Sequence, residues 1–259
     1  MAQQSESQSL SQLESQFLSP LSADLVAQLQ QYSACDISDA LLKLKVPGAG
    51  FIADLVAYSP LPGSQADSSA VTVAPVSTVL FVPKGQKGQA LEDGGGSSGN
   101  LPAFNIPKDT HWADLAEPGT FVVLKQPPGQ TNAVCGGIMA LRMKVRQVRG
   151  IVVAGRVRDL DELRSTSLPI WGYGTSTVGA GGGSVPWATQ VPVEINGVVI
   201  NPGDIAFHDP VNGVVIIPRD KVDRVLELLP DMVAADARVK EDVLKGMSVH
   251  EAFKLHRGT

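Results

Sequence analysis

Apolar residues recur along the chain in two patterns, short β-branched runs and stretches with helical spacing. The β-branched runs predict strands at residues 71–75, 77–82, 120–125 and 150–155. Several short strands are predicted over residues 191–217, because Asn196-Gly197 and Asn212-Gly213 are both two-residue hairpin signals.

Helical spacing begins near the N-terminus. Ser22 is placed as the N-cap of a helix that continues to about Tyr32. Asp36 is expected to cap the start of a second helix, because a carboxylate stabilises a helix N-terminus.

The C-terminal part is predicted to be helical. An apolar stripe over residues 222–229 predicts a helix that is broken at Pro230. A further helix is expected to reach about Lys245, and Ser248 and Glu251 have capping-box spacing for a short last helix.

The stretch from residue 131 to residue 164 holds the most specific residues. Gly136-Gly137 opens a helix-compatible run, 138–148, and a glycine turn leaves backbone N–H groups at the helix start free to bind an anion. A buried strand at 150–155 follows. Arg158 and Asp159 stand just after it, where open α/β sheets usually hold ligands.

The helix start and the strand end predict one pocket. A carboxylate-bearing substrate is expected to bind backbone groups at the helix start and a guanidinium at the strand end. Asp159 is expected to hold a hard divalent cation, which often needs only one or two protein carboxylates. The alternative is an Arg–Asp pair that only terminates a strand. The residues predicted to bind the substrate are Gly136, Gly137, Ile138, Met139 and Arg158.

Composition sets the class of protein. The 259 residues, 43% of them hydrophobic, allow one sizeable core or a domain with extensions. A net charge of −5 and a pI near 5.4 argue against non-specific binding to nucleic acid or an anionic membrane. The first twenty residues lack a basic, apolar signal sequence, and no window is apolar over a membrane-spanning length, so a soluble, cytoplasmic protein is expected.

The two cysteines, Cys35 and Cys135, lie far apart without metal-ligand spacing. They are expected to be reduced thiols in a reducing compartment. Cys135 is expected to be a small buried hydrophobe rather than a reactive residue, because no neighbouring histidine is present to lower its pKa.

Three other features are expected to lie outside the chemistry. His111, beside Trp112, is expected to be packed or solvated rather than catalytic. The segment 172–179 lacks the dinucleotide-binding spacing and is expected to be a substrate-facing or interface loop. The glycine-rich stretch 91–100 is expected to be a flexible loop that does not follow the phosphate-loop pattern.

Five ordered motifs resemble those of the RraA-like family, over roughly residues 24–230. That family includes class II 4-hydroxy-4-methyl-2-oxoglutarate aldolases with oxaloacetate decarboxylase activity, and the RraA regulators of ribonuclease E. The GG form of the first motif is more similar to the fungal and plant branch. The motifs are G-G-x-x-A at 136–140, Gly150, G-R-V-R-D at 155–159, P-G-D at 202–204 and N-G-V-V-I-I-P at 212–218.

The resemblance implies a three-layer α/β fold of the swivelling-domain type with C-terminal helices. It also implies a homotrimer or homohexamer. The expected organisation is a flexible tail at 1–21, a catalytic domain at 22–230 and a helical extension at 231–259 that can lie at a subunit interface.

The resemblance also assigns roles to site residues. Asp159 matches the family's metal ligand, for Mg²⁺ or Mn²⁺, and Arg158 matches the arginine that binds the oxo and carboxylate end of the substrate. The amides of residues 137–139 match the carboxylate cradle. Two positions depart from the pattern, because Gly137 replaces an acid of the bacterial aldolases and Ala154 replaces an aspartate of many members.

A further acid of the family comes from the C-terminal region of a neighbouring subunit, and Glu241 or Asp242 are loose matches for it. The function that the resemblance implies is a metal-dependent carbon–carbon lyase that acts on short 2-oxo acids through an enolate. Its substrates are oxaloacetate, by decarboxylation, or 4-hydroxy-4-methyl-2-oxoglutarate, by retro-aldol cleavage to pyruvate. Two alternatives remain open, a non-catalytic RraA-type regulator and a biosynthetic enzyme that uses the same site on another substrate.

Overall fold

The structure, a computed structural model, describes residues 20–60, 70–85 and 101–258. Residues 1–19 of the N-terminal tail and the whole glycine-rich stretch 91–100 lie outside the described residues. The helices are α2 (Ala23–Leu29), α3 (Ala34–Lys43), α4 (Gly137–Val145), α5 (Leu160–Ser165), α6 (Val222–Leu244) and α7 (Val249–His256), with a 3-10 helix, η2, at Trp112–Leu115. The strands are β1 (Val56–Ser59), β2 (Thr72–Pro83), β3 (Phe121–Lys125), β4 (Ala133–Cys135), β5 (Gly150–Val157), β6 (Ile170–Thr175), β7 (Ser184–Thr189), β8 (Val193–Ile195), β9 (Val198–Ile200), β10 (Ile205–Asp209) and β11 (Gly213–Ile217).

Nine of the strands form one mixed sheet, and β8 and β9 form a separate hairpin. The order in the large sheet is β1-β6-β5-β3-β2-β10-β11, with β4 beside β5 and β7 beside β2. Strands β2, β3, β5 and β6 run parallel. Their carboxyl ends therefore point to the same side of the sheet, which is where α/β proteins place ligand sites.

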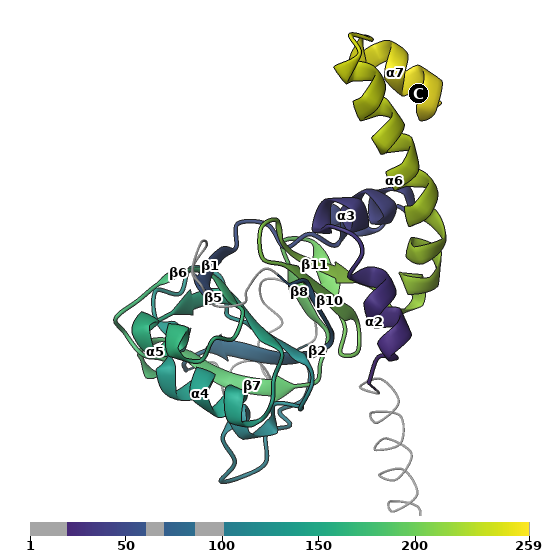
Figure 1. Ribbon diagram of the computed structural model, residues 1–259. Helices are drawn as coiled ribbons and strands as arrows, with labels where there is room; N and C mark the ends of the chain where they lie inside the picture. Colours follow the sequence, from purple (N-terminus) through teal and green to yellow (C-terminus); the bar gives the residue numbers. More distant parts are fainter. Residues whose placement is uncertain (1–19, 61–69, 86–100, 259) are drawn as a thin grey trace, which may run out of the picture.

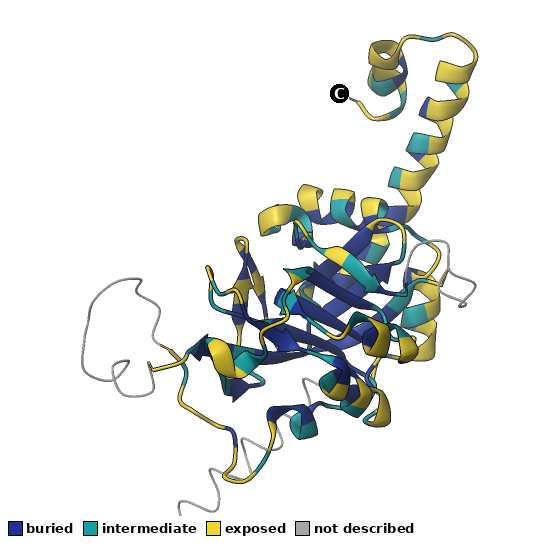
Figure 2. Cartoon of the chain, turned by 90° about the vertical axis from the view of Figure 1, so that its left-hand side faces the viewer, coloured by how far each residue is buried: buried dark blue, intermediate teal, exposed yellow. Residues whose placement is uncertain are grey.

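Three apolar clusters account for the layers seen in Figures 1 and 2. Side chains of β5 alternate between two of them, because Ile151 and Val153 face α4 and α5 while Val152 faces the β8–β9 hairpin. The third cluster joins α2, α3 and α6 to β10 and β11 and includes the fully buried Phe207. The expected three-layer α/β fold with C-terminal helices is confirmed.

Local signals predicted several elements correctly. Ser22 caps α2, and Ser33 with Asp36 forms a capping box at α3. The β8–β9 turn consists of Asn196 and Gly197, both with positive φ. The second expected two-residue turn is wrong, because β10 and β11 are joined by the three residues 210–212. The N–H groups of Val211 and Asn212 donate to Asp209 Oδ1.

The strands expected at 71–75 and 77–82 are one strand, β2. Its first part pairs with β10 up to Pro75 and its second part pairs with β3 from Val76. The pairing with β10 ends at Pro75, which has no N–H to donate. From Val79 the strand also pairs with β7, so one long strand serves three neighbours.

The helix break expected at Pro230 is also wrong, because α6 runs without interruption from Val222 to Leu244. In Figure 1, α6 extends away from the sheet and α7 packs against its far end. The two helices are held by Asp242 with His256, 2.7 Å apart, and by Arg257 Nε with Asp236 at 2.7 Å. None of the described helices is long and apolar enough to cross a membrane.

His208 gives the core an expected pH dependence. Its buried ring lies against Phe121 and Trp171, with ring centroids 5.9 Å apart in both pairs. Burial lowers the pKa of His208 to about 4. The unfolded chain takes up the proton near pH 6.5, so acidification favours unfolding. We expect about 2 kcal/mol of unfolding free energy to be lost between pH 7 and pH 5.

Urea unfolding at the two pH values measures this loss. The His208→Phe variant, which cannot titrate, is expected to lose about 2 kcal/mol less over the same interval. Equal losses in the variant and the wild type would show that other groups cause the pH dependence.

Candidate functional site

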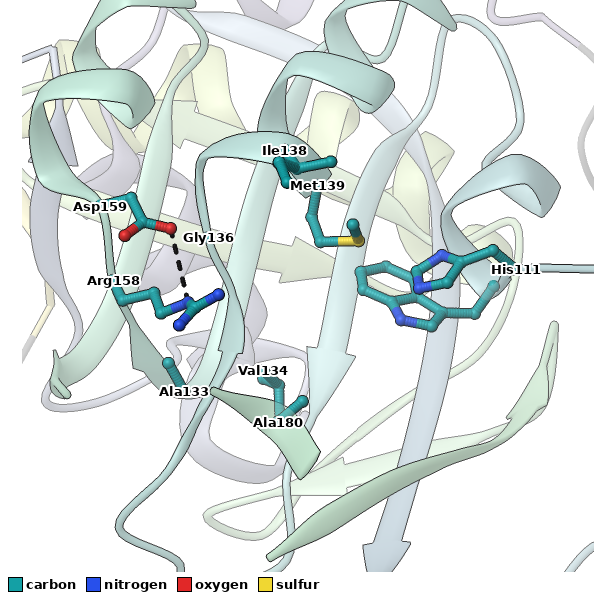
Figure 3. Close-up of a pocket in the computed structure, with 10 residues that line it drawn as sticks. His111, Ala133, Val134, Gly136, Ile138, Met139, Arg158, Asp159 and Ala180 are labelled. Carbon is teal, nitrogen blue, oxygen red and sulfur yellow. Dashed lines mark ion pairs between the residues drawn. The ribbon is translucent and has the colours of Figure 1, made fainter. Parts of the chain in front are cut away.

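A cavity lies at the carboxyl end of β5, bordered by β4, the start of α4, η2 and the loop before β7 (Figure 3). Its volume is about 160 Å³, well below the roughly 300–1,000 Å³ typical of pockets for drug-sized ligands. The cavity therefore fits a small metabolite. It is lined by His111, Trp112, Ala133, Val134, Gly136, Ile138, Met139, Arg158, Asp159 and Ala180.

The structure brings the predicted site residues together. Gly136, Ile138, Met139, Arg158 and Asp159 all line the cavity, whereas Gly137 is buried behind it. The segment 172–179, expected to be a substrate-facing or interface loop, is a loop only in part, because residues 172–175 belong to β6. Ala180, which follows the segment directly, lines the cavity.

The start of α4 presents backbone amides to the cavity. Gly136 is the N-cap, and it leaves the first N–H groups of the helix without a side-chain cap. The Gly137 N–H donates to Asp159 Oδ2 at 3.3 Å. The positive end of the helix dipole therefore faces the site and favours an anion there.

Arg158 and Asp159 form an ion pair, with Nε 3.4 Å from Oδ2. Asp159 has a left-handed backbone, φ 57° and ψ 51°, which turns the chain sharply from β5 into α5. Both side chains are about 40% exposed, so the pair itself adds little stability. No hydrogen bond or ion pair to the Nη groups of Arg158 is found among the described residues, so these groups are available to a ligand.

Two glycines, Gly136 and Gly137, allow the start of α4 to approach the carboxylates of Asp159 and Glu162 closely. A Cβ at Gly136 would lie 2.7 Å from Asp159 Oδ2, and a Cβ at Gly137 would lie 1.8 Å from Glu162 Oε2. Glu162 is not among the residues predicted to form the site. Its position three residues after Asp159, on the first turn of α5, is the signal that places it on the same side.

A buried polar network supports the strand end. Gln126 Oε1 accepts from the Arg156 N–H at 3.0 Å, and Gln126 Nε2 donates to the Asn132 carbonyl at 2.7 Å and to Ser184 Oγ at 3.1 Å. The network ties the segment before β4 to β5 and β7. Gln126 could not be predicted from the sequence, because no local pattern marks it.

Cys135 and Cys35 are both free thiols. Burial, and then the charge of Asp159, raises the pKa of Cys135 to about 12. Cys135 is therefore protonated at neutral pH and unreactive, which confirms that it is a small buried hydrophobe.

The residues present fit a single hard cation. No cluster of three or more His, Cys, Asp or Glu residues suited to a metal exists among the described residues, and Asp159 is the one carboxylate that lines the cavity. Its carboxylate rests against the Gly136 backbone in a space that a Cβ would fill. Mg²⁺ is often held by one carboxylate, with substrate and water oxygens completing its coordination.

Glu241 and Asp242 lie in the C-terminal helices, where they contact Lys245 and Asp242 also contacts His256. They are absent from the residues that line the cavity of their own chain. Their expected role at a neighbouring subunit stays a prediction.

Curated relatives match the chain over part of their length. Protein DlpA of Legionella pneumophila is 26% identical over 230 residues, which cover 88% of this chain and 33% of that protein. A Halalkalibacterium halodurans protein named "Putative 4-hydroxy-4-methyl-2-oxoglutarate aldolase" is 31% identical over 112 residues, 43% of this chain and 52% of that protein. The chain thus spans about a third to a half of these two relatives.

Two solved structures share the fold. An uncharacterised protein from Pseudomonas syringae pv. tomato aligns with a TM-score of 0.69 at 21% identity, over 91% of this chain and 95% of that one. Streptomyces coelicolor RraAS2, described as an unusual member of the RNase ES inhibitor RraA protein family, aligns with a TM-score of 0.61 at 23% identity, over 87% and 97%.

The family model described as Aldolase/RraA matches residues 34–216. This range is more than half of the chain and contains every residue that lines the cavity. With these motifs on this fold, the chain belongs to the RraA-like family.

Proposed function

We propose that the protein is a divalent-metal-dependent carbon–carbon lyase that acts on short 2-oxo acids. The observation that carries the proposal is the meeting of Arg158, Asp159 and the α4 amides in one small cavity. Similarity to a protein named as an aldolase supports the same reaction class.

Arg158 and the α4 amides have complementary roles in this proposal. The amides and the guanidinium bind the carboxylate and the oxo group of the substrate. When the C3–C4 bond of oxaloacetate breaks, its electron pair moves toward the C2 oxygen, CO₂ leaves, and C3 later takes a proton. Arg158 stays protonated and stabilises the negative charge on that oxygen.

Asp159 is the residue that would hold Mg²⁺ or Mn²⁺. A bound divalent cation supplies a Lewis acid that polarises the oxo group. Asp159 is positioned for this role by its left-handed backbone and by the Gly137 N–H, which bonds to Oδ2. In the described part of the chain, no hydrogen bond or ion pair involves Oδ1, so this oxygen is available to a cation.

We propose a homotrimer or homohexamer in the cytoplasm. The α6–α7 helices, which extend from the sheet, provide surface for subunit contacts (Figure 1). Two free cysteines support a reducing compartment.

Decarboxylation is expected to exceed aldol cleavage. Loss of CO₂ needs only the electron sink and a later proton, whereas retro-aldol cleavage also needs a base for the 4-hydroxyl. Gly137 supplies no acid or base where the bacterial aldolases carry an acid. Turnover of oxaloacetate and of 4-hydroxy-4-methyl-2-oxoglutarate by one preparation measures the ratio, and equal or faster aldol cleavage would contradict the expectation.

Pyruvate release from oxaloacetate tests the proposed function. Purified protein is assayed with Mg²⁺ or Mn²⁺, with EDTA, and as Asp159→Ala, each corrected for decarboxylation by the metal alone. Activity that needs both the metal and Asp159 supports the lyase. If wild-type protein binds the ion but matches the metal-only rate, oxaloacetate is not its substrate, and a regulator or an enzyme for another substrate takes its place.

A further inference from the structure

The imidazole of His111 lies at the cavity, across from the Arg158–Asp159 pair. In Figure 3, Met139 separates the His111 ring from these two side chains. The sequence predicts that His111 is packed or solvated, and its ring does pack against Trp112, with ring centroids 5.5 Å apart, while the residue remains exposed. The same ring also forms part of the cavity wall.

The backbone fixes which nitrogen of His111 can donate. His111 is the N-cap of η2, and its Nδ1 accepts a hydrogen bond from the Ala113 N–H at 3.2 Å. Because Nδ1 is the acceptor, the neutral ring carries its proton on Nε2. Among the described residues, no partner bonds to Nε2, so this N–H is available to a ligand.

The His111 ring is also held in place relative to the start of α4. The neighbouring Trp112 is buried and packs edge-on against Phe81, with ring centroids 5.4 Å apart. Arg142 of α4 pairs with Asp114 of η2 at 2.6 Å. His111 is therefore preorganised, which limits the entropy lost when it binds a ligand.

The lining has two polar ends and an apolar middle. Val134, Ile138 and Met139 carry no hydrogen-bonding groups suited to a carboxylate. Apart from buried Trp112, only His111 and Arg158 among the lining side chains have N–H donors. Two donors separated by an apolar wall match a short molecule with an anionic group at each end.

We propose that His111 binds the second carboxylate of the substrate through Nε2–H and thereby selects dicarboxylic over monocarboxylic 2-oxo acids. The assignment rests on the proposed function for the oxo-acid end at Arg158. It adds a specificity residue to that site. In oxaloacetate the carboxylate that His111 binds is the one that leaves as CO₂, so this hydrogen bond is expected to lower KM and not to speed the bond-breaking step.

Ligand binding tests this role without requiring turnover. Calorimetry in the presence of Mg²⁺ gives Kd for two ligands. 2-Oxoglutarate carries a second carboxylate at the end opposite its 2-oxo acid group. Oxalate is expected to be too short to reach from Arg158 to His111. His111→Ala is expected to raise Kd for 2-oxoglutarate at least roughly tenfold, the effect of losing a hydrogen bond to a charged group. Kd for oxalate is expected to change less than about twofold, since no contact to His111 is lost.

Two further variants separate a specific role from a structural one. In His111→Gln the amide N–H can replace Nε2–H, so most of the 2-oxoglutarate affinity is expected to return. His250→Ala removes an exposed histidine of α7, far from the cavity lining, and is expected to have no effect.

The same variants distinguish this inference from the proposed function. If wild type decarboxylates oxaloacetate while His111→Ala leaves both Kd values and the KM unchanged, the inference is overturned and the lyase stands. If the wild type has no turnover but His111→Ala raises Kd for 2-oxoglutarate and not Kd for oxalate, the inference stands and the lyase is overturned. Parallel loss of oxalate and 2-oxoglutarate affinity in His111→Ala also overturns the inference, because it indicates a collapsed cavity.

Discussion

Arg158→Ala is expected to lower kcat/KM for oxaloacetate by about 10²–10³, the usual effect of removing one donor that stabilises a developing oxyanion. The Nε of Arg158 is engaged by Asp159, so its Nη groups are the donors for the substrate. Steady-state pyruvate release, corrected for the metal-only rate, measures the loss. Arg158→Lys keeps the charge but not the planar fork, and an intermediate rate is expected.

Arg156→Ala is the matched control for this loss. Arg156 lies in β5, two residues before Arg158, but its Nη1 bonds to the Thr175 carbonyl at 3.0 Å and its side chain is absent from the cavity lining. The Arg158 N–H bonds to the Cys135 carbonyl at 3.0 Å, a contact that an alanine keeps. Arg158→Ala with wild-type turnover, or an equal loss in Arg156→Ala, would contradict the assignment.

The parts of the site that could be predicted from the sequence are those encoded by neighbouring residues. The glycine pair at a helix start and the charged pair after a buried strand each lie within a few residues, and β5 and α4 form as expected. The glycine pair and the charged pair meet because β4 pairs in parallel with β5, which brings Cys135 beside Val157.

The parts that sequence missed depend on contacts between distant segments. His111 reaches the cavity because η2 docks on α4 through the Asp114–Arg142 pair, and no periodicity signals that contact. Gln126 acts only because Asn132 and Ser184 are brought to it by the fold.

Pro230 illustrates tertiary packing overriding a local rule. Proline removes one helical hydrogen bond and its ring strains the preceding turn. Here the proline itself is exposed. Before it, Val225 and Leu229 are buried in the third apolar cluster, against α3. After it, Ala235 and Val239 are buried along the same helix. Burial on both sides of the proline keeps a single helix axis.

Gly137→Ala is expected to lower the free energy of unfolding by about 2–3 kcal/mol, the effect of an extra methyl in a tightly packed contact. The new Cβ would lie 1.8 Å from Glu162 Oε2 and 2.5 Å from Glu162 Cβ, so α4 and α5 must move apart. Urea unfolding measures the change. Gly181→Ala, whose Cβ would meet nothing within 4 Å, is the control and is expected to stay within about 0.5 kcal/mol of wild type.

A double-mutant cycle with Glu162→Gly identifies the clash as the cause. Removing the whole Glu162 side chain vacates the space that the alanine needs, so the double variant should be more stable than the sum of the single losses by about 1–2 kcal/mol. Strictly additive losses would place the strain elsewhere. Because the Gly137 N–H also bonds to Asp159 Oδ2, movement of α4 displaces the predicted metal ligand. Metal affinity should therefore fall in Gly137→Ala and recover in the double variant, which would link the packing of α4 on α5 directly to the geometry of the site.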